Sequence, residues 1–277
     1  MYKVIIVIPI YQNLISNNDR ISLRQLISLC RSDYEICFAA PKKIIKKNYL
    51  KTLNLGNTFE FEFFENSFFK SLLTYNKLLT SEIFYRRFKY YDYLLIHHLD
   101  AFMFKNEIQY WCSQGFGSIG APIYYFNGTS TPHSYFCNGN GGFCLRHISS
   151  CLNVLKSNKI VYGLEDICKD LNMYNWKGKI LRAIYYLDMF SSLGNRSNPN
   201  FNRIRVNEDL FWSFYVPRTY KWFKIPDRLT AASFSIEFNG ENLLKELDDV
   251  IPMGCHGWNR EILIDFFQPL IEQYKLD

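Results

Sequence analysis

Several features that would identify other classes of protein are missing from this sequence of 277 residues. No two of its eight cysteines form a C-x-x-C pair, which argues against a zinc ribbon. The glycine cluster at 139–142 is not followed by Lys-Ser or Lys-Thr, so it cannot be a P-loop. No recognised nucleic-acid-binding motif accompanies the net charge of +6, and nucleic acid is not an expected partner.

Long apolar runs are also absent from the start of the chain. Met1 leads into a predicted strand at 4–10, which is too short for a membrane span or for a signal-peptide core followed by a cleavage site. Cysteines scattered through apolar segments, such as Cys30, Cys37, Cys144 and Cys151, are typical of buried reduced thiols. We therefore expect a cytoplasmic protein, either soluble or peripheral at the inner face of the membrane.

Apolar residues are abundant enough for a large core. They make up 48% of the chain, and a chain of this length can bury one α/β core. No linker and no internal repeat divides it. A single domain over residues 1–277 is therefore expected.

Apolar patterning predicts alternating strands and helices. Strands are expected at 4–10, 34–40, 59–64 and 93–99, and helices at 19–31 and 67–88. This order predicts a parallel sheet with right-handed crossovers. In the second half we expect strands at 115–125 and 142–145, and helices at 146–157, 208–215 and 260–275. The Ser- and Asn-rich segment 191–202 is the best candidate for a mobile loop.

The strand at 93–99 leads directly into Asp100. A strand this apolar is typical of a buried sheet, and ligand sites of open α/β sheets lie at the carboxyl ends of the strands. Asp100 therefore stands where chemistry is expected, although Asp is also a common turn residue. By strand alternation, His98 is predicted to point to the same face as Asp100.

A glycine cluster near the middle of the chain is a second candidate. Gly141 and Gly142 allow the backbone to approach a ligand closely. Asn140 adds an amide group suited to the hydroxyl groups of a ligand. A plain turn is the alternative.

An acidic pair at the start of a predicted helix is the third candidate. Glu208 and Asp209 follow Asn207, which suits N-capping of the helix by Asn207, with the two acids complementing the helix dipole. The same position also suits a general base. Both roles are compatible.

Five segments together resemble the signature blocks of a family of bacterial GT-A-type glycosyltransferases long catalogued only as a domain of unknown function. The segments are Ile8-Pro9-Ile10-Tyr11, His98-Leu99-Asp100 running on to Gly120-Ala121-Pro122, Gly139-Asn140-Gly141-Gly142-Phe143, Asn207-Glu208-Asp209-Leu210-Phe211-Trp212 and Gly254-Cys255-His256-Gly257-Trp258. The resemblance spans residues 4–258 and implies an α/β fold with a GT-A-like, Rossmann-type central mixed sheet flanked by helices. It also implies a nucleotide-binding half at 1–125 and an acceptor or catalytic half at 126–277.

The resemblance implies a divalent metal, Mn²⁺ or Mg²⁺, that neutralises a leaving diphosphate. Only the last carboxylate of the family's Asp-x-Asp is present, as Asp100, which would be the first ligand. His256 matches a C-terminal histidine that often supplies a second ligand, with a core imidazole as the alternative. His98 would contact ribose or close the pocket. Because an imidazole ligand must be neutral, metal affinity would fall as pH drops through about 6.5.

The remaining roles follow from the same resemblance. The Glu-Asp pair of related enzymes supplies the base for inverting transfer, which favours Asp209 over Glu208. Pro9 and Tyr11 lie where those enzymes hold the nucleotide base, so Tyr11 would stack on it unless it is a core aromatic. Asn140, Gly141 and Gly142 would approach the donor sugar or the acceptor. Trp258 is expected to line the same donor and acceptor site.

The implied activity is that of a metal-dependent, hexosyltransferase-like glycosyltransferase. It would move a sugar from a nucleotide-diphosphate donor, expected to be UDP-linked, to a saccharide or lipid-linked saccharide acceptor of a cell-surface polysaccharide or lipopolysaccharide. Two alternatives stay open. One is a catalytically silent carbohydrate-binding or assembly protein, motivated by the incomplete Asp-x-Asp, and the other is a metal-dependent nucleotidyltransferase.

A basic and apolar segment at 176–190 suggests a further partner. Lys177, Lys179 and Arg182 are mixed there with bulky apolar residues. This composition suits peripheral contact with anionic lipid, and a solvated helix edge over the core is the alternative.

Overall fold

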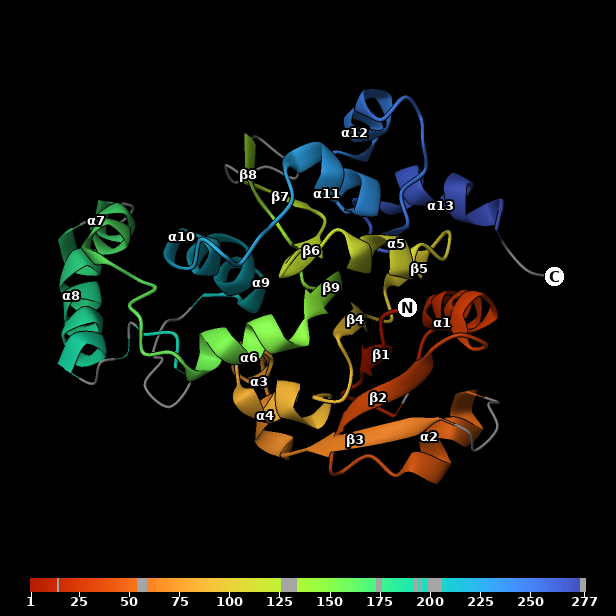
Figure 1. The fold of residues 1–277 in the computed structure, drawn as a ribbon, viewed down its shortest axis with the longest axis horizontal. Coiled ribbons are helices and arrows are strands. Elements are labelled where there is room, and N and C mark those ends of the chain that lie inside the picture. Colours follow the sequence, from red (N-terminus) through yellow and green to blue (C-terminus); the bar gives the residue numbers. More distant parts are fainter. Residues whose placement is uncertain are drawn as a thin grey trace.

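The computed structural model describes residues 1–13, 15–53, 59–125, 134–172, 176–191, 194, 196–198 and 206–274. Its centre is a six-stranded sheet of order β3-β2-β1-β4-β9-β6 (Figure 1). Four neighbouring strands are parallel, namely β1 Val4–Pro9, β2 Glu35–Pro41, β3 Glu60–Phe64 and β4 Tyr93–His97. Two are antiparallel to their neighbours, β9 Phe143–His147 and β6 Ser118–Gly120. The predicted α/β class with a central mixed sheet flanked by helices is confirmed.

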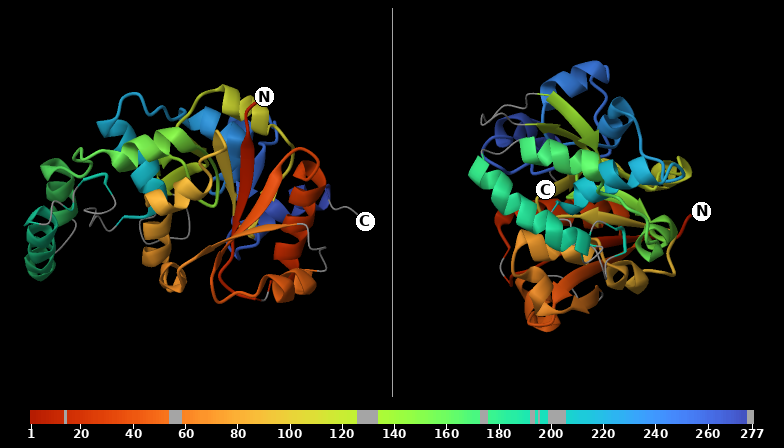
Figure 2. Two further views of the ribbon diagram at one scale, coloured as in Figure 1. Left: turned by 60° about the horizontal axis from the view of Figure 1, so that its bottom comes forward. Right: turned by 90° about the vertical axis from the view of Figure 1, so that its left-hand side faces the viewer.

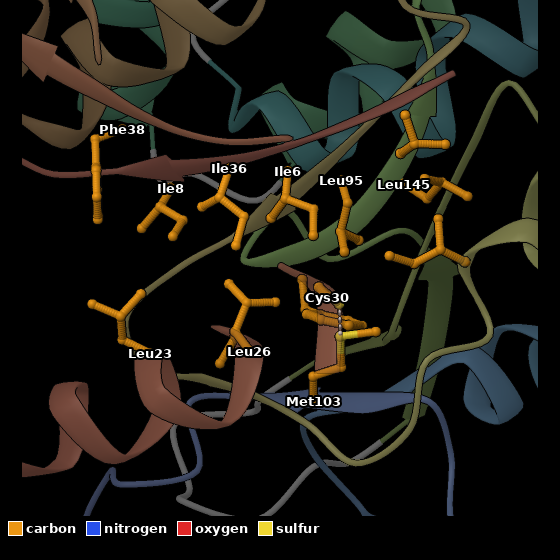
Figure 3. Packing of buried hydrophobic residues seen from close by; sticks show 14 of the residues in the cluster. Ile6, Ile8, Leu23, Leu26, Cys30, Ile36, Phe38, Leu95, Met103 and Leu145 are labelled. Atoms are coloured by element: carbon orange, nitrogen blue, oxygen red, sulfur yellow. Dashed lines mark hydrogen bonds between the residues drawn. The ribbon is translucent and has the colours of Figure 1, made fainter. Parts of the chain in front are cut away.

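Both faces of this sheet are covered, which explains the near-continuous apolar run of β1. Ile6 and Ile8 face Leu23 and Leu26 of α1 (Asn17–Cys30), as Figure 3 shows. The alternate residues of β1 pack on the other face against α3 (Leu72–Leu79), α4 (Glu82–Arg87) and α6 (Ile148–Lys156). Helices α2 (Lys46–Leu53) and α5 (Ile108–Ser113) join the face of α1. A strand buried on both sides loses its alternation of polar and apolar residues.

The prediction of one long helix at 67–88 is wrong, because this segment forms three separate helical pieces. A 3₁₀ turn at Asn66–Phe69 is followed by α3 and α4. Ser71 and Ser81 each accept a hydrogen bond from a backbone N–H three residues ahead, which starts a new helix. A serine hydroxyl competes with helix continuation in this way.

The strand predicted at 115–125 is also divided. Strand β6 pairs with β9 in the main sheet, whereas β7 (Pro122–Tyr125) pairs with β8 (Ser134–Asn138) in a separate ribbon. The carbonyl of Ala121, between the two, accepts the backbone N–H groups of Gly139 and Asn140. The chain therefore changes sheets at Ala121.

A second, three-stranded sheet joins the middle of the chain to its C-terminal part. It has the order β10-β11-β5, with β10 Ser235–Ile236, β11 Gly254–His256 and β5 Ala101–Met103. Helices α11 (Arg228–Phe234), α12 (Gly240–Glu246) and α13 (Ile264–Glu272) lie around it in Figure 1. The predicted helix at 208–215 is a run of α9 (Glu208–Leu210), a π-helix (Phe211–Tyr215) and α10 (Val216–Thr219).

Helices α7 (Leu164–Asn172) and α8 (Trp176–Ser191) stand apart from the main body in Figures 1 and 2. Among the described residues, no helix combines the length and the apolarity needed to cross a membrane. Most of the loop predicted at 191–202 lies outside the described residues. The four cysteines expected as buried thiols are indeed free and buried.

Candidate functional site

Asp100 and His256 meet where the two sheets join. Strand β4 ends at His97, and after a short turn the chain enters β5, whose Ala101 is paired with His256 of β11. The Trp258 N–H donates to the Asp100 carbonyl over 3.2 Å. As a result, His256 Nε2 lies 3.2 Å from Asp100 Oδ1, although the two residues are remote in sequence.

His98 completes a group of three possible metal ligands. One ligand atom from each of His98, Asp100 and His256 lies within 4.8 Å of the other two. The prediction that His98 and Asp100 share a face rested on strand alternation, which does not apply here. Both residues lie in the turn after β4, where the Ala101 N–H donates to the His98 carbonyl. The hydroxyl of Tyr75 lies 3.1 Å from His98 Nε2, which fixes the ring.

Two residues that the sequence did not indicate surround His256. Glu237 follows β10 and places Oε1 3.0 Å from His256 Nδ1. Arg260 donates to Glu237 over 2.6 Å through Nη1, and its Nη2 lies 3.2 Å from Asp100 Oδ2. The only sequence signals were a carboxylate after the short apolar segment 234–236 and a cation four residues after His256.

Charge strongly shifts the pKa values of this cluster. Burial lowers the pKa of His256, but the carboxylates of Glu237 and Asp100 outweigh burial and raise it to about 9. Burial raises the pKa of Asp100, yet His256, His98 and Arg260 hold it well below its usual range. Burial and the neighbouring His256 lower the pKa of His98 to about 3. Without a metal ion, His256 is therefore charged and His98 neutral at pH 7.

The glycine cluster lies against these side chains. A Cβ on Gly142 would overlap the ring of His256, and one on Gly141 would overlap the carboxylate of Glu208. The predicted close approach is therefore to the protein's own side chains. The Asn140 amide, expected to face a sugar, donates to Glu237 over 2.6 Å and accepts from the Gly142 N–H.

The two acids at 208–209 have different surroundings. Glu208 is buried in an ion pair with Arg146. Asp209 is half-buried, and burial together with the charge of Glu208 raises its pKa to about 7. Asn207 is the N-cap residue of α9, but its side chain makes no capping bond and instead accepts from the Asn76 amide. The predicted side-chain cap is therefore wrong.

A cavity of about 560 Å³ opens beside Asp100, over the carboxyl ends of β1 and β4. Pro9, Tyr11 and His98 line it together with Asp100. Its other lining residues come from the segment after β1, from α1 and from the start of α3: Ile10, Gln12, Asp19, Phe69, Lys70, Ser71, Leu72, Tyr75 and Leu99. Tyr11 is 61% exposed, so it is not a core aromatic.

Trp258 does not line this cavity. Its side chain is buried with Phe102 in the small sheet, and its indole N–H donates to Ser22 Oγ over 2.7 Å. The structure thus brings together the residues predicted at 9–11, 98–100 and 256, and keeps the Trp258 ring in the core.

The three ligand atoms suit a divalent cation. Two imidazoles and one carboxylate are a common donor set, and the carboxylate of Glu237 beside His256 Nδ1 is the kind of outer contact that orients a ligating histidine. Before a metal ion binds, the positive Arg260 and the proton on His256 both oppose a cation. The three side chains can therefore hold a metal ion beside the cavity.

Comparison with known proteins gave several distant structural likenesses. No curated protein matches the chain. Mouse xyloside xylosyltransferase 1, in its apo form, aligns over 94% of this chain and 98% of its own with 9% identity and a TM-score of 0.48. Core-mannan synthase A from Aspergillus fumigatus, in an Mn/GDP form, aligns over 45% of this chain and 43% of its own, with 10% identity and a TM-score of 0.36. The mannosyltransferase Ktr4p from S. cerevisiae aligns over 45% of this chain and 40% of its own, with 12% identity and a TM-score of 0.34.

The chain spans less than half the length of either fungal mannosyltransferase. A family model described as "protein of unknown function (DUF5672)" matches residues 58–256, which include Asp100, the glycine cluster, Asp209 and His256. This match covers well over half of the chain, and the protein therefore belongs to the DUF5672 family.

Proposed function

We propose that this protein is a metal-dependent glycosyltransferase that moves a sugar from a nucleotide-diphosphate donor to a saccharide acceptor. The observation that carries the proposal is the convergence of His98, Asp100 and His256 beside a 560 Å³ cavity that His98 and Asp100 line. A cavity of this size suits a nucleotide sugar, and a cation beside it suits a diphosphate.

Each residue of the site has a role in this proposal. His98, Asp100 and His256 hold Mn²⁺ or Mg²⁺, which when bound neutralises the negative charge of the leaving diphosphate. Asp209 accepts the proton of the acceptor hydroxyl while that oxygen bonds to the anomeric carbon and the bond to the diphosphate breaks. Glu208 supports the site through its ion pair with Arg146. A direct displacement of this kind inverts the anomeric centre.

The two proposed halves of the chain have different tasks. All residues that line the cavity lie within 1–125, with Pro9 and Tyr11 beside the expected nucleotide base. Asp209, His256 and the glycine cluster belong to 126–277, the proposed acceptor and catalytic half. A UDP-linked donor and a cell-surface polysaccharide or lipopolysaccharide acceptor remain part of the proposal.

A panel of nucleotide sugars with Mn²⁺ and without acceptor tests this function against its alternatives. Slow hydrolysis that releases a nucleoside diphosphate supports the transferase. Release of pyrophosphate would instead indicate a nucleotidyltransferase. Sugar binding without turnover would indicate a silent carbohydrate-binding protein.

The affinity for a metal ion is expected to change with pH up to about pH 9, rather than only around the pH of 6.5 predicted from the sequence. Because His256 has a pKa of about 9, a bound metal ion must displace its proton at any lower pH. Mn²⁺ affinity should therefore rise about tenfold per pH unit towards pH 9, rather than levelling off above about 6.5. Calorimetry in buffers of different ionisation enthalpy measures the affinity and the released proton. Affinity that is constant from pH 7 to pH 9 would contradict this assignment of His256.

Helix α8 is the proposed membrane contact, at the inner face of the membrane of a cytoplasmic protein. Trp176, Ile180, Ile184 and Leu187 recur at helical spacing and are 67%, 55%, 62% and 71% exposed. The opposite side of α8 packs with α7 through Tyr186 and Met189. An exposed apolar stripe beside lysines suits the surface of an anionic membrane, where lipid-linked acceptors are presented.

Binding to lipid vesicles tests this contact. The protein should co-sediment with vesicles that contain phosphatidylglycerol and much less with pure phosphatidylcholine, since each lysine contributes about 1 kcal/mol near an anionic surface. Ile184→Asp should weaken binding by about tenfold or more, because burial of its side chain is lost and a charge is added. The control Ile83→Asp changes an exposed isoleucine of α4. Equal binding by both variants would rule out α8 as the contact.

A further inference from the structure

Arg260 contacts the same two side chains that the metal centre requires. Its Nη2 lies 3.2 Å from Asp100 Oδ2 and 3.3 Å from His256 Nε2. A guanidinium group is always charged in proteins, so Arg260 neutralises Asp100 together with the protonated His256 when no metal ion is bound. A divalent ion bound to Asp100 and His256 must therefore compete with Arg260 for these atoms.

Arg260 has room to leave this position, and the fold provides a second partner for it. Its side chain is 39% exposed, whereas that of Glu237 is 4% exposed. The Arg260 Nη1 donates to Glu237 Oε1 over 2.6 Å, independently of the contacts of Nη2. The guanidinium can thus release Asp100 and His256 while it remains paired with Glu237.

A tight turn sets Arg260 against His256. Gly257 has a φ of +68°, and the Arg260 N–H donates to the Gly257 carbonyl over 3.0 Å. A Cβ on Gly257 would lie 2.7 Å from Arg260 Nε. The positive φ favours glycine at this position, and the absence of a Cβ leaves room for the arginine side chain.

Glu237 acts on the other nitrogen of His256. Its Oε1 lies 3.0 Å from His256 Nδ1, and its Oε2 accepts the Asn140 amide over 2.6 Å. A carboxylate beside Nδ1 favours the proton on that nitrogen and leaves the Nε2 lone pair for a metal ion. The Asn140 amide holds the Glu237 carboxylate in place, which keeps the proton of neutral His256 on Nδ1.

We propose that Arg260 and Glu237 control the metal centre in opposite directions. Arg260 occupies Asp100 and His256 in the metal-free protein and is displaced when a divalent ion binds, whereas Glu237 holds His256 in its ligating form. This inference rests on the proposed function, because it requires the metal centre. It makes Arg260 and Glu237 positioning residues rather than ligands.

Opposite effects on metal affinity follow from these two roles. When a site is partly occupied by an internal competitor, its apparent affinity falls by the fraction of molecules in which it is open. Loss of Arg260 should therefore tighten metal binding. Loss of the Glu237 charge should weaken it, as is usual for carboxylates that orient a ligating histidine. A purely structural role for both residues would weaken binding in both variants.

The test is Mn²⁺ binding to the whole protein without nucleotide, measured by calorimetry and by the loss of the free-ion electron paramagnetic resonance signal. Arg260→Gln should bind Mn²⁺ at least about tenfold more tightly than the natural protein. Glu237→Gln should bind it about 10- to 100-fold more weakly. Arg228→Gln, which removes an arginine paired with Glu246 outside the site, should leave the affinity unchanged.

The outcomes separate this inference from the proposed function. Equal or weaker binding by Arg260→Gln overturns the inference, while the metal centre stands if the natural protein binds Mn²⁺. A natural protein that binds no Mn²⁺ overturns both.

If Arg260→Gln does not fold, Arg260→Lys takes its place, because a lysine keeps the charge but loses the forked guanidinium group that reaches Glu237 and Asp100 together. Tighter binding by the lysine variant supports the inference, and unchanged binding overturns it.

Discussion

Replacement of Asp100 by asparagine is expected to lower donor turnover by about two orders of magnitude or more, since loss of a charge-stabilising contact at the leaving group costs about 3 kcal/mol. Asp100 is the one carboxylate among the three possible metal ligands. Its side chain is 29% exposed, and asparagine has the same shape, so the fold should persist. Steady-state hydrolysis of a nucleotide sugar in Mn²⁺ measures the effect.

The matched control for this variant is Asp33→Asn, which neutralises an exposed carboxylate away from the site. It should keep full activity, and thermal unfolding should show that both variants are folded. Chelation by EDTA should reproduce the loss seen with Asp100→Asn. A folded Asp100→Asn protein with near-normal turnover, or a natural protein active in EDTA, would remove Asp100 from the centre.

Replacement of Asp209 by asparagine should abolish most transfer and leave donor affinity within a few fold. Proton removal by a positioned base contributes about 10²- to 10⁴-fold, and it operates in the transition state rather than in donor binding. Burial and Glu208 raise the pKa of Asp209 to about 7, and the base acts only when ionised. Turnover by the natural protein should therefore rise with pH through about 7, and the residual activity of the variant should lack this rise.

A transfer assay beside calorimetry of donor binding measures both quantities. The informative comparison is Glu208→Gln, which leaves the buried Arg146 without its ion-pair partner. Removing one partner of a buried pair costs about 3–5 kcal/mol, so this variant should lose stability as well as activity. If donor binding collapses in Asp209→Asn together with turnover, Asp209 is a donor or structural residue and not the base.

The position of Asp100 could be predicted because local sequence determines it. A strand that is apolar without alternation must be buried on both sides, and the turn after it lies at the edge where ligands bind. His256 required the resemblance, since nothing in Gly254–His256 reveals that β11 pairs with β5. That pairing joins segments from distant parts of the chain, and single-sequence patterns carry no information about it.

Glu237 and Arg260 were missed for the same reason. Each is an ordinary charged residue beside a short element, and their meaning appears only when both sheets are assembled around His256. The break of the predicted helix at 67–88 has a local cause. Ser71 and Ser81 cap α3 and α4, but the apolar periodicity continues on both sides of them and so predicts one helix.

A crystal structure with Mn²⁺ and UDP, with the ion located by its anomalous signal, would show whether Asp100 and His256 hold a metal ion beside the diphosphate. We expect an ion within about 2.5 Å of an oxygen of Asp100 and of His256 Nε2, with the diphosphate on the ion and the base beside Tyr11. The Arg260 guanidinium should have left Asp100. A bound nucleotide whose diphosphate lies away from Asp100 and His256, with no ion between them, would contradict this expectation.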